Sequence, residues 1–161
     1  MTASFSSVAQ KIGFVDTDFI LNSIPEYKAA QTELDKLSVD WQKEIEAKYN
    51  EIDKLYKAYQ ADAILLTDDM KKKRENEIIN KEKEVKELQK QRFGVDGELF
   101  KKRQELVKPL QDKIYNAVKA VAERSGLAII LDKAGQVAIL YANNKYDKSD
   151  DVLTYMGYNK K

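Results

Sequence analysis

The fold of this 161-residue chain is decided by residues 26–93, which read EYKAAQTELDKLSVDWQKEIEAKYNEIDKLYKAYQADAILLTDDMKKKRENEIINKEKEVKELQKQRF. These 68 residues contain neither glycine nor proline, the two residue types that most often interrupt a helix. Most of them are lysine, glutamate, aspartate, glutamine or alanine, so a helix formed here should be solvated on most sides. The segment therefore predicts a long helical excursion from a globular core.

Apolar and aromatic residues follow one stripe along the first part of this segment. Their spacing averages about 3.67 residues per step, close to an 11-residue repeat, whereas a left-handed coiled coil needs 3.5. The stripe can therefore face one partner helix without strong supercoiling. Its members are Ala30, Leu34, Leu37, Trp41, Ile45, Tyr49, Ile52, Tyr56, Tyr59 and Ala63.

The chain can reverse direction at residues 64–69, where Thr67 or Asp68 can cap a new helix. The second helix should run back from Met70, break at residues 93–97 and resume at Glu98. It should end at Ser125, before Gly126. The result is an antiparallel helical hairpin.

Short β-like segments lie at both ends of the chain, at residues 11–15, 128–131 and 137–141. The last two flank residues 132–136, which read as a hairpin loop with Gly135 placed for a positive φ. Brief helices should follow the first strand, over residues 18–22, and close the chain near Met156. The sequence predicts an α+β fold, a long antiparallel helical hairpin (a coiled-coil-like arm) on a small β body. The predicted boundaries are a tail at 1–10, the body at 11–24 and 126–161, and the hairpin at 25–125 with its tip near 64–69.

Three residues of the returning helix can loosen or bend it: Gly94, Gly97 and Pro109. Glycine frees the backbone, and an internal proline removes one helical hydrogen bond. These residues predict either a hinge or a static kink fixed by packing, and the pattern does not separate the two.

Composition argues against several classes of function. The chain has 28 basic and 27 acidic residues closely interleaved, and a nucleic-acid binder would need a basic patch. The one basic run, residues 71–74, reads as a solvated helix face. Histidine and cysteine are absent, which removes imidazole bases, thiolates and the usual zinc ligands. We expect no catalytic residue, metal or cofactor, and interpret Asp16 and Asp18 as helix caps.

No apolar run approaches the ~20 residues that span a bilayer, so stable membrane insertion is not expected. The first nine residues lack the basic and hydrophobic regions of an intact signal peptide. Ser7 and Ala9 are nevertheless spaced like the small residues before a signal cleavage point. This segment is either the remnant of an export signal or an ordinary terminal tail.

Two sets of residues are candidates for binding and self-association. The aromatic row can either pack on the second helix or bind a partner, whereas apolar residues at a hairpin tip indicate a binding surface. The candidate binding residues are Trp41, Tyr49, Tyr56, Tyr59, Ile64, Leu65, Leu66 and Met70. The β body is too small to be stable alone, so it should self-associate. The expected oligomerisation core is Ile12, Phe14, Ile129, Leu131, Val137, Ile139 and Tyr141.

In order and spacing, five stretches of the chain resemble the Skp/OmpH family of periplasmic chaperones. They are residues 12–16 (IGFVD), 66–75 (LTDDMKKKRE), 93–100 (FGVDGELF), 118–122 (VKAVA) and 128–132 (AIILD). The resemblance implies a jellyfish-like homotrimer whose three hairpins surround a cavity. It also implies a periplasmic holdase that keeps unfolded outer-membrane β-barrel proteins soluble without ATP.

The net charge of +1 departs from the strongly basic relatives, so this chain offers less electrostatic capture of acidic clients. A prefoldin-like holdase is disfavoured because its β segment lies between the helices, and here the strands are at the chain ends. The competing hypothesis is a coiled-coil interaction scaffold, an adaptor that binds one folded partner.

Overall fold

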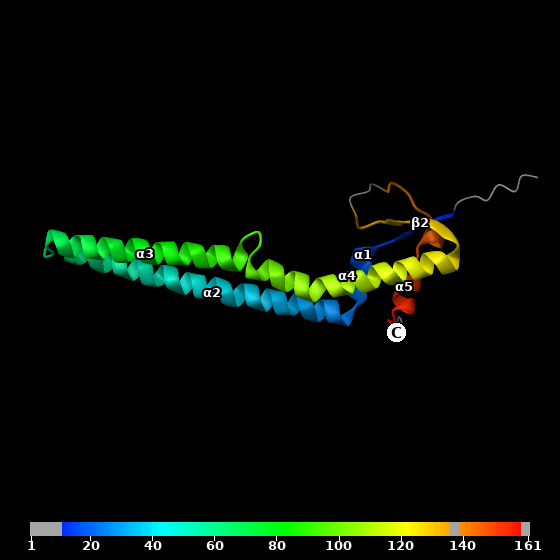
Figure 1. The fold of residues 1–161 in the computed structure, drawn as a ribbon, viewed down its shortest axis with the longest axis horizontal. Helices are drawn as coiled ribbons and strands as arrows, with labels where there is room; N and C mark the ends of the chain where they lie inside the picture. Colours follow the sequence, from blue (N-terminus) through cyan, green and yellow to red (C-terminus); the bar gives the residue numbers. More distant parts are fainter. Residues whose placement is uncertain (1–10, 136–138, 159–161) are drawn as a thin grey trace, which may run out of the picture. The chain divides into compact units, whose positions relative to one another are not determined.

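A computed structural model describes residues 11–135 and 139–158, which are mostly helical with one small sheet (Figure 1). The elements follow in the order β1 (Lys11–Val15), α1 (Thr17–Ser23), α2 (Pro25–Asp62), α3 (Asp68–Phe93), α4 (Glu98–Ser125), β2 (Leu127–Asp132), the 3-10 helix η1 (Asn144–Tyr146) and α5 (Ser149–Tyr155). The chain divides into two units. The first unit comprises residues 1–30 and 106–161, and the second comprises residues 31–105.

The sheet of the first unit joins the two ends of the chain. Strands β1 and β2 pair in parallel, with Ile12 opposite Ile129 and Phe14 opposite Leu131. Lys133 extends the pairing, since its backbone N–H donates to the carbonyl of Val15 at 2.7 Å. This confirms that the N- and C-terminal segments build one β structure.

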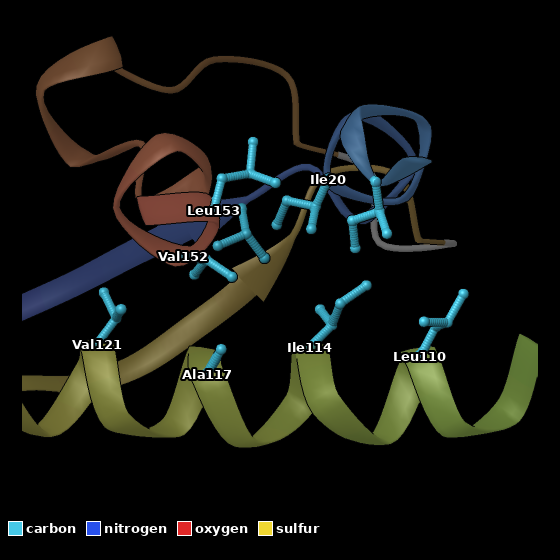
Figure 2. Packing of buried hydrophobic residues seen from close by; sticks show 9 residues of the cluster. Ile20, Leu110, Ile114, Ala117, Val121, Val152 and Leu153 are labelled. Atoms are coloured by element: carbon cyan, nitrogen blue, oxygen red, sulfur yellow. The ribbon is translucent and has the colours of Figure 1, made fainter. Parts of the chain in front are cut away.

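The core of the first unit lies between α4, α1 and α5. Leu110, Ile114, Ala117 and Val121 recur every three or four residues, so they occupy one face of α4 (Figure 2). That face packs on Ile20 of α1 and Val152 of α5, both of which are fully buried. The remaining buried members of this cluster are Val15, Ile24 and Leu153.

Polar contacts fix the helix ends of the first unit. The Asp16 carboxylate accepts from the backbone N–H of Phe19 at 2.9 Å, which confirms its role as the cap of α1. Asp132, at the end of β2, accepts from the backbone N–H of Thr17 at 3.1 Å and from its hydroxyl at 2.7 Å. Gly126 has a φ of 61° and ends α4, as its position after Ser125 predicts.

The second unit is a pair of antiparallel helices, residues 31–62 of α2 alongside α3, followed by the start of α4 (Figure 1). Ile45 and Ile52 of α2 pack on Ile78 and Val85 of α3. These two are the buried residues of α3, since most of its other side chains are charged. The chain reverses between α2 and α3, where Thr67 caps α3 by accepting from the N–H of Met70 at 3.3 Å. The predicted reversal at 64–69 is confirmed.

The predicted β-hairpin is wrong for the described residues. Residues 139–143 form no strand, and β2 pairs with β1 instead. Asp147 bridges to Phe14 on the other edge of β1, and Lys148 donates its N–H to the Phe14 carbonyl at 2.8 Å. Residues 139–143 therefore lead to this edge rather than pairing with β2. The prediction for Gly135 is also wrong, because its φ is not positive.

Candidate functional site

The turn between α2 and α3 presents apolar side chains to solvent. Ile64 is 95% exposed and Leu65 is 84% exposed, while Leu66 is partly buried. Met70, in the first turn of α3, is 49% exposed. The structure thus places the residues predicted for the tip together, with Ile64 and Leu65 the most accessible. We call Ile64, Leu65, Leu66 and Met70 the tip cluster.

The aromatic row of α2 divides into exposed and engaged residues. Tyr49 and Tyr56 are about half exposed. Tyr59 packs against the buried cluster of Ile45, Ile52, Ile78 and Val85. Its hydroxyl donates to a carboxylate oxygen of Glu75 at 2.5 Å. This hydrogen bond raises the pKa of Tyr59. Tyr49 and Tyr56 therefore offer ring surface to a partner, while Tyr59 links α2 to α3.

Tyr49 borders a shallow groove in the second unit, with a volume of about 360 Å³. Its walls combine aromatic and aliphatic side chains with side-chain amides, which can both donate and accept hydrogen bonds. They include Gln42, Ile45, Tyr49, Asn50, Gln89 and Phe93.

Trp41 contacts residues at the end of α3 and is only partly exposed. Its ring meets that of Phe93 edge-to-face, with centroids 6.2 Å apart. The Arg92 guanidinium lies over the same ring, 4.7 Å from its centroid. The sequence predicts that the aromatic row either packs on the second helix or binds a partner, and Trp41 packs on the second helix.

Arg92 joins three helices at this point. Its guanidinium pairs with Glu98, the first residue of α4, and with Glu44 of α2 at 3.4 Å. Gln91 also donates to Glu98, at 2.7 Å. Hydrogen bonds from Gln91 and Arg92 lower the pKa of Glu98, so its carboxylate stays ionised at neutral pH and the pairing is lost only on acidification.

We call Trp41, Glu44, Arg92 and Glu98 the Arg92 clasp. Sequence reasoning missed Arg92, Glu44 and Glu98 because each is one charged residue among many on charged helices. Only the pairing of α2 with α3 brings Glu44, which is 48 residues away in the sequence, to Arg92.

The predicted interruption between α3 and α4 is confirmed at residues 94–97. Neither Gly94 nor Gly97 has a positive φ. A Cβ on Gly94 would lie 2.4 Å from the carbonyl oxygen of Lys90, and one on Gly97 would lie 2.9 Å from that of Gln91. Both positions therefore require glycine because the backbone passes too close for a side chain. Pro109 lies inside α4. A hinge at these residues stays a prediction.

The residues predicted for self-association differ in exposure. Ile12 and Ile129, which are paired across the sheet, are each nearly half exposed, and Tyr141 is 83% exposed. Leu131 and Ile139 are partly buried, and Phe14 is already covered within the chain. Val137 lies outside the described residues. Leu140, which sequence reasoning did not select, is 99% exposed.

The described residues offer neither a cluster of metal ligands nor a membrane-spanning helix. No three acidic side chains there converge to hold a metal ion. In the same residues, no helix combines the length and the apolar character needed to cross a bilayer.

Comparison with protein families identifies the relatives of this chain. The family model described as outer membrane protein (OmpH-like) matches residues 11–156. The chain belongs to the OmpH-like family. The match covers β1, the helices α1–α5 and β2, so the resemblance expected from the sequence is confirmed.

A solved structure supports the OmpH-like fold. It is a crystal structure from Caulobacter crescentus of a protein described as a candidate outer membrane chaperone (OmpH-like). The similarity has a TM-score of 0.74 and covers 99% of this chain and 89% of the other, at 14% sequence identity. Comparison with curated proteins gave no match.

Replacing Gly94 by alanine should destabilise the second unit, because the added methyl group would overlap the Lys90 carbonyl. We expect a loss of about 1–3 kcal/mol in the free energy of unfolding, as for other forced overpacking. Gly135→Ala is the control, since its Cβ would meet no atom closer than 3.4 Å. Urea unfolding followed by circular dichroism measures both variants. Equal stability of the two would contradict the close approach.

Proposed function

We propose that this OmpH-like chain is a periplasmic holdase that binds unfolded outer-membrane β-barrel proteins without ATP. The observation that carries the proposal is the tip cluster, in which Ile64 and Leu65 are almost fully exposed. Apolar side chains exposed together on a surface usually mark an interaction site. Family membership and the likeness to the Caulobacter crescentus protein support the same assignment.

The client contacts should be many and individually weak. Tyr49 and Tyr56 add half-exposed rings to α2, and the groove beside Tyr49 adds amide groups that can bind a peptide backbone. An unfolded chain has no fixed shape, so scattered contacts of this kind suit it better than one deep pocket. No cofactor is part of the proposal.

Three copies acting together would strengthen such weak contacts. We propose that the chain forms a homotrimer through the sheet, with Ile12, Ile129 and Tyr141 as exposed members of the interface. Three hairpins would then surround one client and keep it from other clients. Each contact made by one copy raises the local concentration of the client at the others, so overall affinity exceeds that of a single hairpin.

The holdase proposal predicts slower client aggregation. A urea-unfolded outer-membrane β-barrel protein, diluted into buffer with one equivalent of trimer and no nucleotide, should scatter less light over time than it does alone. Unchanged aggregation would contradict the proposal. Binding to one folded partner, with no effect on unrelated unfolded chains, would instead favour the adaptor hypothesis.

Charges in the tip cluster should weaken holding. Leu65→Asp with Leu66→Asp removes two apolar contacts per copy, and we expect the client to bind about tenfold more weakly. The control is Val95→Asp, which places one charge at an 89% exposed apolar residue outside the tip cluster. Competition with a fluorescent client measures both. Equal affinity of the two variants would exclude the tip cluster as the client site.

The trimer proposal predicts a mass of about three times the 18.5 kDa of one chain, measured by sedimentation. Ile129→Asp should shift the protein toward the monomer, because it places a charge in the proposed apolar interface. Ile79→Asp is the matched control, since Ile79 is 44% exposed and Ile129 is 46% exposed. A monomeric unmodified protein would contradict the cavity model.

A further inference from the structure

The break between α3 and α4 has little of its own to hold it in place. Three backbone hydrogen bonds enter it, from the N–H of Gly94 to Lys90, of Gly97 to Gly94 and of Lys101 to Gly97, at 2.8–3.0 Å. Val95 and Asp96 are exposed and add no packing. Two glycines in four residues leave the unfolded backbone unusually free. A segment of this kind needs side chains from elsewhere to keep one conformation.

The Arg92 clasp supplies those side chains from both sides of the break. Arg92 is in the last turn of α3, and Glu98 is the first residue of α4, so their pairing closes the break directly. Trp41 and Glu44 come from α2, which runs past the break as one continuous helix. The clasp therefore connects the two helices that flank the break, α3 and α4, to the continuous helix α2.

Arginine is suited to this position by its geometry. Its guanidinium is planar, so it can stack on the Trp41 ring while its edge donates to two carboxylates, which a lysine ammonium cannot do. The Arg92 side chain is only 22% exposed, and its buried Nε has no hydrogen-bond partner within the described residues. A charge placed this way depends on both carboxylates, because removing one leaves it poorly compensated.

We propose that the Arg92 clasp locks the α3–α4 break, and that the break becomes a flexible joint only when the clasp opens. The glycines allow the tight path of the backbone, while Arg92 selects one conformation of it. The inference does not rest on the proposed function, since it concerns the chain without any client.

Spin-label distances test the inference directly. The protein has no cysteine, so Glu84→Cys with Gln104→Cys places two labels at exposed positions on either side of the break, both within the second unit. A narrow distance distribution is expected in this background. Arg92→Leu keeps the aliphatic part of the side chain and removes its charge, so the distribution should broaden. An unchanged distribution in Arg92→Leu would overturn the inference.

Two controls show whether any broadening belongs to the break. Arg74→Leu removes an exposed arginine that pairs with Glu77 inside α3, and it should leave the distribution narrow. Labels at Lys72→Cys and Glu87→Cys, both on α3, should report no change in Arg92→Leu. Broadening of equal size in either control would overturn the inference.

Hydrogen exchange gives a second readout at the same place. The amides of Gly97 and Lys101 close the break, so they should exchange about tenfold faster in Arg92→Leu, in keeping with the loss of a charge-assisted hydrogen bond. If Arg92→Leu loses helix content, the same measurements are made on Glu98→Gln, which keeps the side-chain shape. Unchanged distances and exchange in a folded Glu98→Gln variant would then overturn the inference.

Discussion

The parallel pairing of β1 with β2 is the constraint on which the rest of the structure depends. Parallel strands cannot be joined by a tight turn, and they need a crossover segment between them. Here the crossover comprises residues 16–126, so the helices α1 to α4 lie between the two strands in sequence. A chain that leaves β1 must return to pair as β2. The helix α2 is therefore followed by helices of the opposite direction, α3 and α4.

A two-stranded sheet is marginal alone, and its stability depends on the helices that cover it. One face is covered by the row of apolar residues on α4 together with Ile20 and Val152. The Asp132 carboxylate secures the junction between β2 and α1 through two hydrogen bonds to Thr17. The opposite face keeps Ile12 and Ile129 half exposed, and this is the surface that the proposed trimer would bury.

The second unit depends on a much smaller apolar core, with two buried residues on α3. Polar contacts between its helices therefore matter more than in a globular core. Tyr59 with Glu75 joins the helices near their turn, and the Arg92 clasp joins them where the returning helix breaks. A helical pair with so little buried surface leaves the tip cluster, Tyr49 and Tyr56 accessible to solvent, and these are the residues that the proposed holdase would use for weak contacts with a client.

Much of the fold follows from local sequence. The absence of glycine and proline over residues 26–93 predicts the long helices. The capping residues Thr67 and Gly126 predict the turn before α3 and the end of α4. The exposed tip cluster follows from that turn. These features are determined by neighbours along the chain, because caps and helix propensity act over a few residues.

The tertiary structure alone decided which distant residues meet. An apolar stretch does not specify which strand it pairs with, so the sequence predicts residues 137–141 as the partner of β2, whereas β2 pairs with β1. Glycine at positions 94 and 97 reads as flexibility, whereas the folded backbone requires it for close approach. Arg92 is one charge among many until α2 brings Trp41 and Glu44 beside it. Contacts between residues far apart in sequence depend on how the elements pack, and that packing is a property of the whole folded chain.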